Sequence, residues 1–424
     1  MLDWDDPTSA FKKDAAIPTS ATKTTTSQVQ AQTVSESASA VSSRSTGALT
    51  DAAEQAAIAA NIDSAGNNDS AASQAVVQKL LAEPSSFEQS LEPVKVEDKR
   101  IINGEGDINQ LAPFKYPWAW NYFLNANKNH WTPLDVNMTK DVQDYHHRLT
   151  VEEKHVYENV LAYLTTSDIL AMRNIGLAVM EKMTAPELQI YQARQVFEEA
   201  MHTWTYQHCI ETMGLDQSEI YNRYRVVPEL YQKIKMANDI LSSVLHPDID
   251  LKNPDELDNF VHSYLFFAGV FEGCWFYNGF SPIFSLQRRG LMTGTAEQLQ
   301  YIMRDEVLHS GFGMRVVKEI VKEENLTLDE NRLRRMWDES EAAEITYANY
   351  ILRDPILGYT AEDHIEQFRF IANRRARQLN IFEPFPGAEN PLSWLDEQAN
   401  LRKEKNFFET RVTEYQTGAA LSWD

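Results

Sequence analysis

The sequence predicts an all-α protein in which long helices form a bundle. Helix-start signals recur as a hydroxyl residue three positions before a carboxylate or an amide, in Thr150 with Glu153, Thr184 with Glu187, Thr295 with Gln298 and Thr327 with Glu330. Glycine or proline follows several periodic segments, and no run of strands with turn signals competes. We expect helices over residues 150–183, 185–213, 254–289, 295–324 and 328–352, with others before and after. Helices of this length are typical of bundles that build a site in their core.

The first 98 residues differ from the rest of the chain. They are dominated by Ser, Ala, Thr, Gln and Asp, and their only aromatic residues are Trp4, Phe11 and Phe87. Such a segment buries too little apolar surface to offset the entropy lost on ordering. We therefore predict a disordered extension over residues 1–98, a folded domain over 99–402 and a flexible tail over 403–424.

Charge and targeting signals exclude several classes of protein. The formal net charge of -23 argues against a nucleic-acid partner, because phosphate binding needs clustered Lys and Arg. The N-terminal MLDWDDPTSA has no apolar run, and the most apolar stretch, SYLFFAGVFEGCWFYNGF, is interrupted by Glu272, so neither a signal peptide nor a membrane span is expected. The only cysteines, Cys209 and Cys274, show no disulfide or CxxC pattern. We expect a reduced, cytoplasmic protein.

A Glu-x-x-His pattern, which puts both side chains on one helical face, occurs three times. Glu152 and His155 lie in the first turn of an expected helix, in VEEKH, where a solvated face is the simpler interpretation. The other two pairs lie mid-helix among apolar residues, and they are Glu199 with His202 and Glu306 with His309. Buried carboxylates and imidazoles there need partners.

Helix pairing would supply those partners. Asp168 and Glu199 are symmetric about the turn at Met183 and Thr184, so an antiparallel hairpin brings them to the same depth. Glu272 and Glu306 are likewise symmetric about position 289. Two clusters follow: Asp168, Glu199 and His202, and Glu272, Glu306 and His309. So many close carboxylates could not all ionise alone, so we predict two divalent metal ions; the alternative is a set of buried ion pairs with Arg or Lys.

The ligand set indicates the metal, and Tyr206 indicates the chemistry. Oxygen-rich ligation with one imidazole per metal suits iron or manganese better than zinc. Tyr206 follows His202 by four residues on the same face, so it should lie beside the metals, among Phe276, Phe280 and Ile302. It is either a buried tyrosine with a satisfied hydroxyl or a tyrosine that is oxidised by one electron and kept dry.

These motifs together resemble the small, radical-generating subunit of class I ribonucleotide reductase, of the bacterial type with a tyrosyl radical. The resemblance covers residues 99–424 and rests on TTSDILAMR, FEEAMHTWTY, VFEGCWFYNGF and RDEVLH. It implies a ferritin-like fold with two iron ions per chain, manganese or mixed Mn/Fe being the alternative. Asp168, Glu199 and His202 would bind one metal and Glu272, Glu306 and His309 the other.

The resemblance also implies roles for four further residues. Tyr206 would hold the radical, Trp131 and Asp305 would relay an electron and a proton, and Tyr415 in the tail would continue the relay into a large subunit. Without the resemblance, Trp131 could be ordinary core, Asp305 could pair with Arg304, and Tyr415 could be a docking anchor.

The implied activity is that of a ribonucleoside-diphosphate reductase, active only with the large subunit. The site would use O2 to form the radical, a homodimer of this chain would bind the large subunit through the C-terminal tail, and a thioredoxin- or glutaredoxin-type reductant would complete turnover. Two cysteines and no P-loop or Gly-rich dinucleotide motif mean that the nucleotide binds elsewhere. A di-iron oxygenase or desaturase acting directly on an apolar substrate, and a ferritin-like storage protein, are the alternatives.

Two details of the sequence raise separate questions. Some family members carry tryptophan where this chain has Gln195, which puts the hydrogen bonding behind the ligands and electron delivery in doubt. Both ends of the chain carry Leu-x-Trp-Asp, at Leu2–Asp5 and Leu421–Asp424. The repeat is either coincidence in a biased segment or a second docking element for the large subunit.

Overall fold

The computed structural model describes residues 95–104, 115–246 and 248–395. Within these ranges the chain is helical apart from its connections, and its only β pairing is an isolated bridge between Ile356 and Tyr359. The N-terminal half contains η3 (Val96–Asp98), α3 (Pro117–Ala126), η5 (Pro133–Asp135), α4 (Thr139–His147), α5 (Val151–Asn174), η6 (Ile175–Val179), η7 (Met180–Lys182), α6 (Pro186–Thr212), α7 (Gln217–Val226) and α8 (Pro228–Ser242). The C-terminal half contains α9 (Pro254–Leu265), η8 (Phe266–Phe276), α10 (Tyr277–Arg288), α11 (Thr293–Glu323), α12 (Glu330–Ile351) and α13 (Ala361–Leu379).

The five predicted helices are confirmed, each to within two residues at either end when α5 is read through η7 and α9 through α10. The predicted N-terminal caps of these helices are less accurate. Thr150 and Glu153 do form a capping box, but α6 begins after Ala185, which makes no side-chain cap, and α12 is capped by Asp329. Thr184 donates instead to the Arg100 carbonyl, and Thr295 lies inside α11 and donates to Asp141. Tertiary partners therefore took the hydroxyls that the local pattern assigned to caps.

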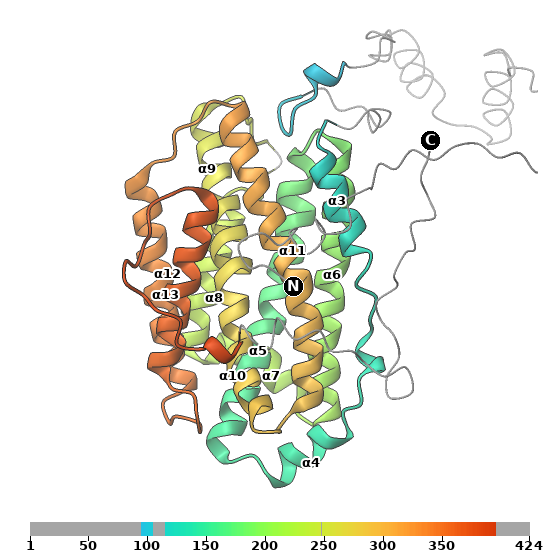
Figure 1. Cartoon of the computed structure of the whole chain (residues 1–424), viewed down its shortest axis with the longest axis vertical. Coiled ribbons are helices and arrows are strands. Elements are labelled where there is room, and N and C mark those ends of the chain that lie inside the picture. The colour runs from blue at the N-terminus through green and yellow to red at the C-terminus, as the bar shows by residue number, and fades with distance from the viewer. Residues whose placement is uncertain (1–94, 105–114, 247, 396–424) are drawn as a thin grey trace, which may run out of the picture. The chain divides into compact units, whose positions relative to one another are not determined.

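Two antiparallel pairs form the centre of the bundle. Figure 1 shows α5, α6, α8 and α11 running side by side along the long axis, and α5 packs on α6 as η8 packs on α11. The breaks follow from residue type: Pro186 opens α6, and Gly290, with φ of 72°, follows the end of α10. Both hairpins predicted from symmetry are present.

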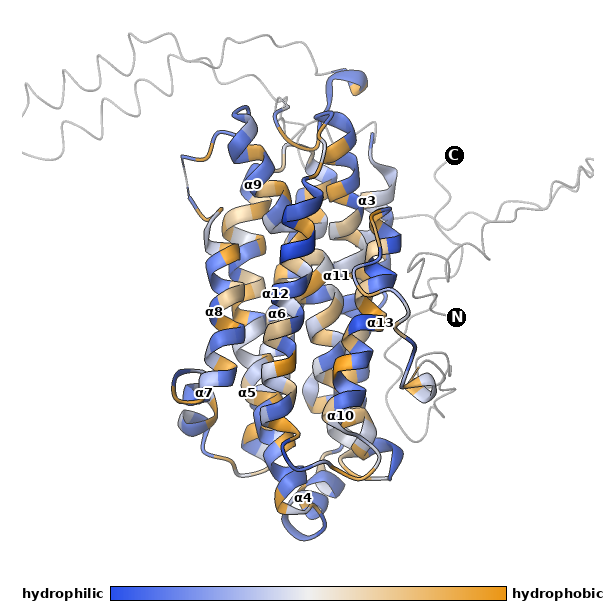
Figure 2. Ribbon diagram, turned by 90° about the vertical axis from the view of Figure 1, so that its left-hand side faces the viewer, coloured by the Kyte–Doolittle hydropathy of each residue, from blue (hydrophilic) through white to orange (hydrophobic). Residues whose placement is uncertain are grey.

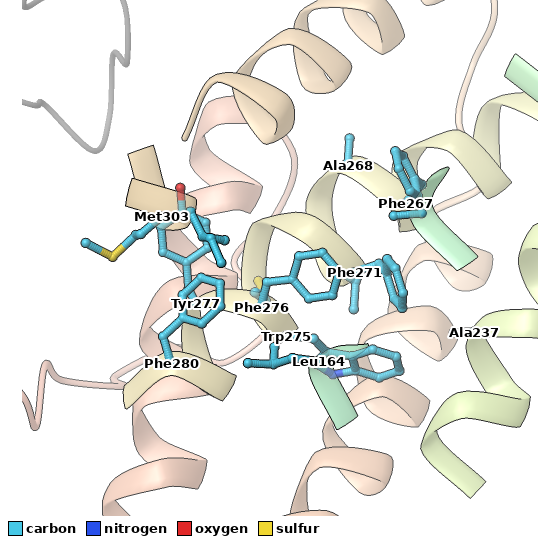
Figure 3. Packing of buried hydrophobic residues seen from close by; sticks show 14 of the residues in the cluster. Leu164, Ala237, Phe267, Ala268, Phe271, Trp275, Phe276, Tyr277, Phe280 and Met303 are labelled. Carbon is cyan, nitrogen blue, oxygen red and sulfur yellow. The ribbon is translucent and has the colours of Figure 1, made fainter. Parts of the chain in front are cut away.

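The helices bury one face each. Buried residues of α12 recur at helical spacing, from Leu333 through Trp337 and Tyr347 to Ile351, and α12 shows a largely hydrophilic face in Figure 2. The segment η8 is buried along its whole length. Figure 3 shows its aromatic residues packed together. The ring centroids of Phe271 and Phe276 lie 4.9 Å apart. Among the described residues no helix is both long and apolar enough to cross a membrane.

A buried charged network lies among α8, α10, α12 and α13. The Lys233 ammonium forms an ion pair with Glu344, whose other oxygen accepts from Asn278 at 2.6 Å and pairs with His364 Nε2 at 2.7 Å. The rings of Tyr163, Tyr347 and Trp275 surround the ammonium at 4.0, 4.3 and 4.9 Å. This Lys233 network, defined by Lys233, Glu344, His364 and Asn278, carries its own cation.

Candidate metal centre

The six predicted ligands come together in the middle of the two hairpins. Asp168 lies on α5, Glu199 and His202 on α6, Glu272 on η8, and Glu306 and His309 on α11. All are fully buried. Their donor atoms form two overlapping groups, Asp168 with Glu199 and His202, and Glu272 with Glu199, Glu306 and His309. The two predicted clusters therefore exist, but they share a carboxylate.

Glu199 and Glu306 each face both histidines. Glu199 Oε2 lies 3.6 Å from His202 Nδ1, and its Oε1 lies 3.0 Å from His309 Nδ1. Glu306 repeats the arrangement, with Oε1 3.3 Å from His202 Nδ1 and Oε2 3.6 Å from His309 Nδ1. Asp168 and Glu272 each approach one histidine, at 3.7 and 3.9 Å. The sequence argument assigned each carboxylate to one cluster and so missed that Glu199 and Glu306 could bridge two metals.

The donor atoms that face the centre lack hydrogen-bond partners. Both oxygens of Asp168, Glu199 and Glu306 and the Nδ1 atoms of both histidines are buried without a hydrogen bond. In the described part of the chain the histidines are the only ion-pair partners of these carboxylates. Because such groups are costly to bury unless paired, the oxygen-rich set fits two divalent cations and does not fit the ion-pair alternative with Arg or Lys.

Without cations, protons must offset the charge. Burial raises the pKa of Asp168 and of Glu272 well above the usual range, with a further contribution from neighbouring carboxylates. Burial alone would lower the pKa of His202, but the contact with Asp305 and the nearby Glu199 carboxylate outweigh it and raise that pKa well above its usual value. Glu199 is the exception, since both histidines outweigh its burial and lower its pKa to about 2. Burial therefore favours the neutral form of Asp168 and Glu272 when no cation is bound.

A chain of contacts leads from His202 toward Trp131. His202 Nε2 lies 3.3 Å from Asp305 Oδ2, which also accepts from Trp131 Nε1 at 3.3 Å. Asn129 donates to the other Asp305 oxygen at 2.6 Å. The Trp131 ring stacks on Tyr301, with centroids 5.4 Å apart. Trp131 and Asp305, which the resemblance singled out, are therefore in direct contact with each other and with a ligand.

The structure contains a counterpart that sequence reasoning missed. His309 Nε2 lies 2.8 Å from Glu198 Oε2, and Arg194 Nε donates to the other Glu198 oxygen at 2.8 Å. Glu198 precedes the ligand Glu199 as Asp305 precedes Glu306, and each acid reaches the histidine of the opposite helix. The repeated acid before each ligand glutamate was the available signal.

Tyr206 is fully buried and its hydroxyl makes no hydrogen bond. Burial raises its pKa well above the usual range, and Asp168 is the next largest cause, followed by Glu306 and Glu199. The phenol therefore lies within the electrostatic reach of the ligand carboxylates and away from water. This agrees with the prediction that Tyr206 lies beside the candidate ligands.

The remaining predicted residues are distributed as follows. Gln195 Nε2 donates to Glu272 Oε1 at 2.7 Å, so the amide supplies a hydrogen bond behind the ligand. Glu152 is exposed, and His155 Nε2 contacts the Tyr350 carbonyl at 3.1 Å, so the third Glu-x-x-His pair takes no part in the centre. Tyr415 and both Leu-x-Trp-Asp segments lie outside the described residues.

Two pockets in the described residues lie away from the ligands. An open depression of about 440 Å³ is lined by Leu134, Val136, Asn137, Met138, Thr139, Val142, Gln143, His208 and Thr212. A smaller pocket of about 20 Å³ is lined by Tyr277, Met303, Gln367, Phe370, Ile371, Arg374, Arg375 and Leu395. Neither includes a ligand candidate, so neither offers the deep apolar channel that an oxygenase would need.

Comparison with known proteins gives a consistent result. Residues 108–391 match the family described as ribonucleotide reductase, small chain. The chain is 37% identical over 347 residues to the ribonucleoside-diphosphate reductase subunit beta of Chlamydia pneumoniae, covering 80% of this chain and 100% of that protein. It is 28% identical over 335 residues to the small subunit of Dictyostelium discoideum, covering 78% and 91%.

Solved structures support the same fold. The ribonucleotide reductase R2 subunit of Clostridium botulinum matches with a TM-score of 0.64 at 24% identity, over 72% of this chain and 95% of that one. Dimanganese(II)-NrdF of Streptococcus sanguinis matches with a TM-score of 0.56 at 19% identity, over 69% and 98%. An R2-like ligand-binding oxidase with a Mn/Fe cofactor matches with a TM-score of 0.52 at 19% identity, over 66% and 98%. The predicted ferritin-like bundle is confirmed.

Proposed function

Because the chain belongs to the ribonucleotide reductase small-chain family, we propose that it generates the oxidising equivalent with which a large subunit reduces ribonucleoside diphosphates. The convergence of four carboxylates and two histidines without a Lys or Arg partner carries this proposal. This convergence identifies the residues of this chain that could bind the metals on which the chemistry depends.

The proposed ligands are Asp168 and His202 for one metal and Glu272 and His309 for the other, with Glu199 and Glu306 between them. Two redox-active metals held there would supply, with O2, the oxidising power to take one electron from a nearby side chain. Iron is our proposal for both, on the chemistry of the donor set. Manganese or mixed Mn/Fe is the alternative, since one structural neighbour is a dimanganese(II) protein and another carries a Mn/Fe cofactor.

Tyr206 is the proposed donor of that electron. Its phenol would lose an electron to the oxidised metal site and its hydroxyl proton to a nearby carboxylate such as Asp168, and the ring would retain the radical. Full burial supports this role, because a dry pocket keeps water and reductants from the ring. The nearby Asp168 carboxylate, a candidate ligand, also places the phenol next to the proposed metal site.

The proposed path by which the radical leaves the site runs from His202 through Asp305 to Trp131, and the electron moves along it in the opposite direction. An electron moving to the site from Trp131 would leave the indole ring positive, and Asp305 Oδ2 lies where it can hold the Nε1 proton. Tyr415 would continue this relay into the large subunit, which would dock on the tail at 403–424. We also propose that this chain forms a homodimer and that it functions in the cytoplasm.

An oxygenase acting on an apolar substrate is disfavoured. The relatives that match along most of their length are named as reductase subunits, and neither pocket described above is lined by a ligand candidate. The substrate would therefore be bound by the partner chain.

Electron paramagnetic resonance tests the proposal. We expect the Fe(II)-loaded, oxygenated protein to give a tyrosyl doublet that is lost in Tyr206→Phe, and that variant to lose CDP reduction with the large subunit while keeping its metal content. Tyr191→Phe is a matched control, since Tyr191 is equally buried on the same helix. A doublet that persists in Tyr206→Phe would refute the assignment.

A further inference from the structure

The segment η8 carries Glu272. Near Glu272, its backbone accepts hydrogen bonds from two side chains that are not candidate ligands. Ser310 Oγ donates to the Ala268 carbonyl at 2.8 Å, and Arg375 Nε donates to the Gly273 carbonyl at 2.8 Å. Gly273 follows Glu272 directly, and Ser310 follows His309. The Arg375 contact therefore acts on backbone next to Glu272, and the Ser310 contact joins the neighbour of His309 to backbone earlier in the same segment.

This turn is too tight for a side chain at position 273. A Cβ there would lie 2.6 Å from the Ala268 carbonyl oxygen, 2.8 Å from Ser310 Oγ and 3.1 Å from Arg375 Nε. The first contact is with backbone of the same segment, so it could not be relieved by rotating a side chain. A π-helix is a less favoured backbone than an α-helix and occurs mostly where tertiary contacts stabilise it. Ser310 and Arg375 supply such contacts here.

Arg375 is itself firmly held. It comes from α13, which carries none of the six ligands, and it is 4% exposed. Its Nη1 donates to Gln378 at 3.0 Å, and its guanidinium lies 4.9 Å from the centre of the Tyr277 ring. A planar, permanently charged group fixed in this way can hold a carbonyl in one direction.

We propose that Arg375 is a positioning residue for Glu272, an inference that rests on the proposed two-metal function. Arg375 fixes the backbone next to Glu272, while Gln195 holds the carboxylate, at 2.7 Å. Asp168, the corresponding ligand of the other metal, lies within the regular helix α5. Loss of Arg375 should therefore weaken the metal bound by Glu272 and His309 and spare the metal bound by Asp168 and His202.

Site-resolved metal binding tests this inference. The metal-free full chain is titrated with Mn(II) by calorimetry, and anomalous diffraction at the manganese edge measures the occupancy of each site in crystals. In Arg375→Gln we expect affinity at the Glu272 site to fall about tenfold, as for other groups that orient a ligand, with no change at the Asp168 site. Arg375→Lys, which keeps a donor, should recover part of the loss.

Arg374→Gln is the matched control, because it removes the same charge from the neighbouring position and should bind Mn(II) as the parent does. If Arg375→Gln is too unstable to measure, Ser310→Ala replaces it and should give a smaller loss at the same site. Equal weakening of both sites, or of neither, would overturn the inference. A parent that binds fewer than two Mn(II) ions would contradict the proposed function instead, so the two failures are distinguishable.

Discussion

Two buried clusters of charge lie in this bundle, and they solve the same electrostatic problem in different ways. The Lys233 network pairs one carboxylate, Glu344, with an ammonium, an imidazole and an amide. The metal centre gathers four carboxylates with two histidines, and the described residues bring no Lys or Arg to them. The first cluster is the ion-pair alternative that the sequence left open, realised elsewhere in the same protein.

The comparison shows what distinguishes a structural charge cluster from a metal site. In the Lys233 network, burial lowers the pKa of Lys233 to about 8, whereas Lys233 and His364 outweigh burial and lower the pKa of Glu344 to about 2. Both partners are charged at neutral pH. In the metal centre the pKa of Asp168 and that of Glu272 rise, so carboxylates there take up protons when no cation is present. A cation from outside is needed at only one of the two clusters.

The largest expected effect is on folding, in the Lys233 network. Glu344→Gln leaves a fully buried ammonium without its counter-charge, so we expect the free energy of unfolding to fall by about 3–5 kcal/mol, measured by denaturant titration. Glu341→Gln is the control on the same helix, because its partner Arg369 is 37% exposed, and we expect a loss below about 1 kcal/mol. Equal effects of the two substitutions would show that burial of the Lys233 pair has no special cost.

The opposite behaviour is expected at the metal centre. Glu272→Gln in the metal-free protein should hardly change the free energy of unfolding, because burial raises the pKa of this carboxyl and so favours its neutral form, and Gln195 can still donate to the new amide. Addition of Mn(II) at a hundred times its dissociation constant should stabilise the parent by about 2.7 kcal/mol for each site occupied, and the variant by less. Thermal melts with and without metal measure both. A large loss without metal would mean that Glu272 belongs to a structural network.

The two clusters should also respond differently to pH. Metal ligands must be deprotonated, and burial raises the pKa of Asp168 and Glu272, so Mn(II) must displace protons. The apparent affinity should therefore increase between pH 6 and pH 8, by about tenfold per pH unit for each proton released. The stability that Glu344 contributes is present above its ordinary pKa and is lost only as the pH falls toward about 2. Calorimetry in buffers of different ionisation enthalpy counts the protons, and a pH-independent affinity would contradict the account.

The smallest expected effects on metal binding concern Asp305 and Glu198, the two carboxylates that contact the candidate ligand histidines. Asp305→Asn and Glu198→Gln each remove a carboxylate behind a ligand histidine, so each should weaken metal binding about tenfold. Only Asp305 also contacts Trp131, whereas Glu198 pairs with Arg194. With metal sites saturated, we expect Asp305→Asn to lose CDP reduction with the large subunit and Glu198→Gln to retain it. Equal CDP reduction by the two variants would show that the relay does not run through Asp305.

The sequence predicted the helices and the meeting of the six candidate ligands because both depend on spacing. Helical periodicity and hairpin symmetry were enough to bring Asp168 to the depth of Glu199. The bridging geometry of Glu199 and Glu306 depends on side-chain rotamers across four helices, which spacing does not fix. Two predicted caps failed because tertiary partners, Asp141 and the Arg100 carbonyl, took the hydroxyls of Thr295 and Thr184, and Asp329 caps the helix that Thr327 was expected to start.

Other features were beyond any local pattern. The π-helix at Glu272 is contacted by Arg375, which lies 102 positions from its hydrogen-bond partner Gly273. Lys233 and Glu344 are similarly remote in sequence, and nothing near either residue indicates that the other will neutralise it. Long-range pairing of this kind appears only when the helices are assembled.

The most direct test of the account is the number of metal ions that the metal-free chain binds. Titration with Fe(II) under argon, or with Mn(II), followed by metal analysis after gel filtration, should give two ions per chain. Glu199→Ala, which removes the carboxylate that both clusters share, should give fewer than two. A parent that binds no more than one ion, or a Glu199→Ala variant that still binds two, would contradict the central claim that this cluster is a two-metal centre.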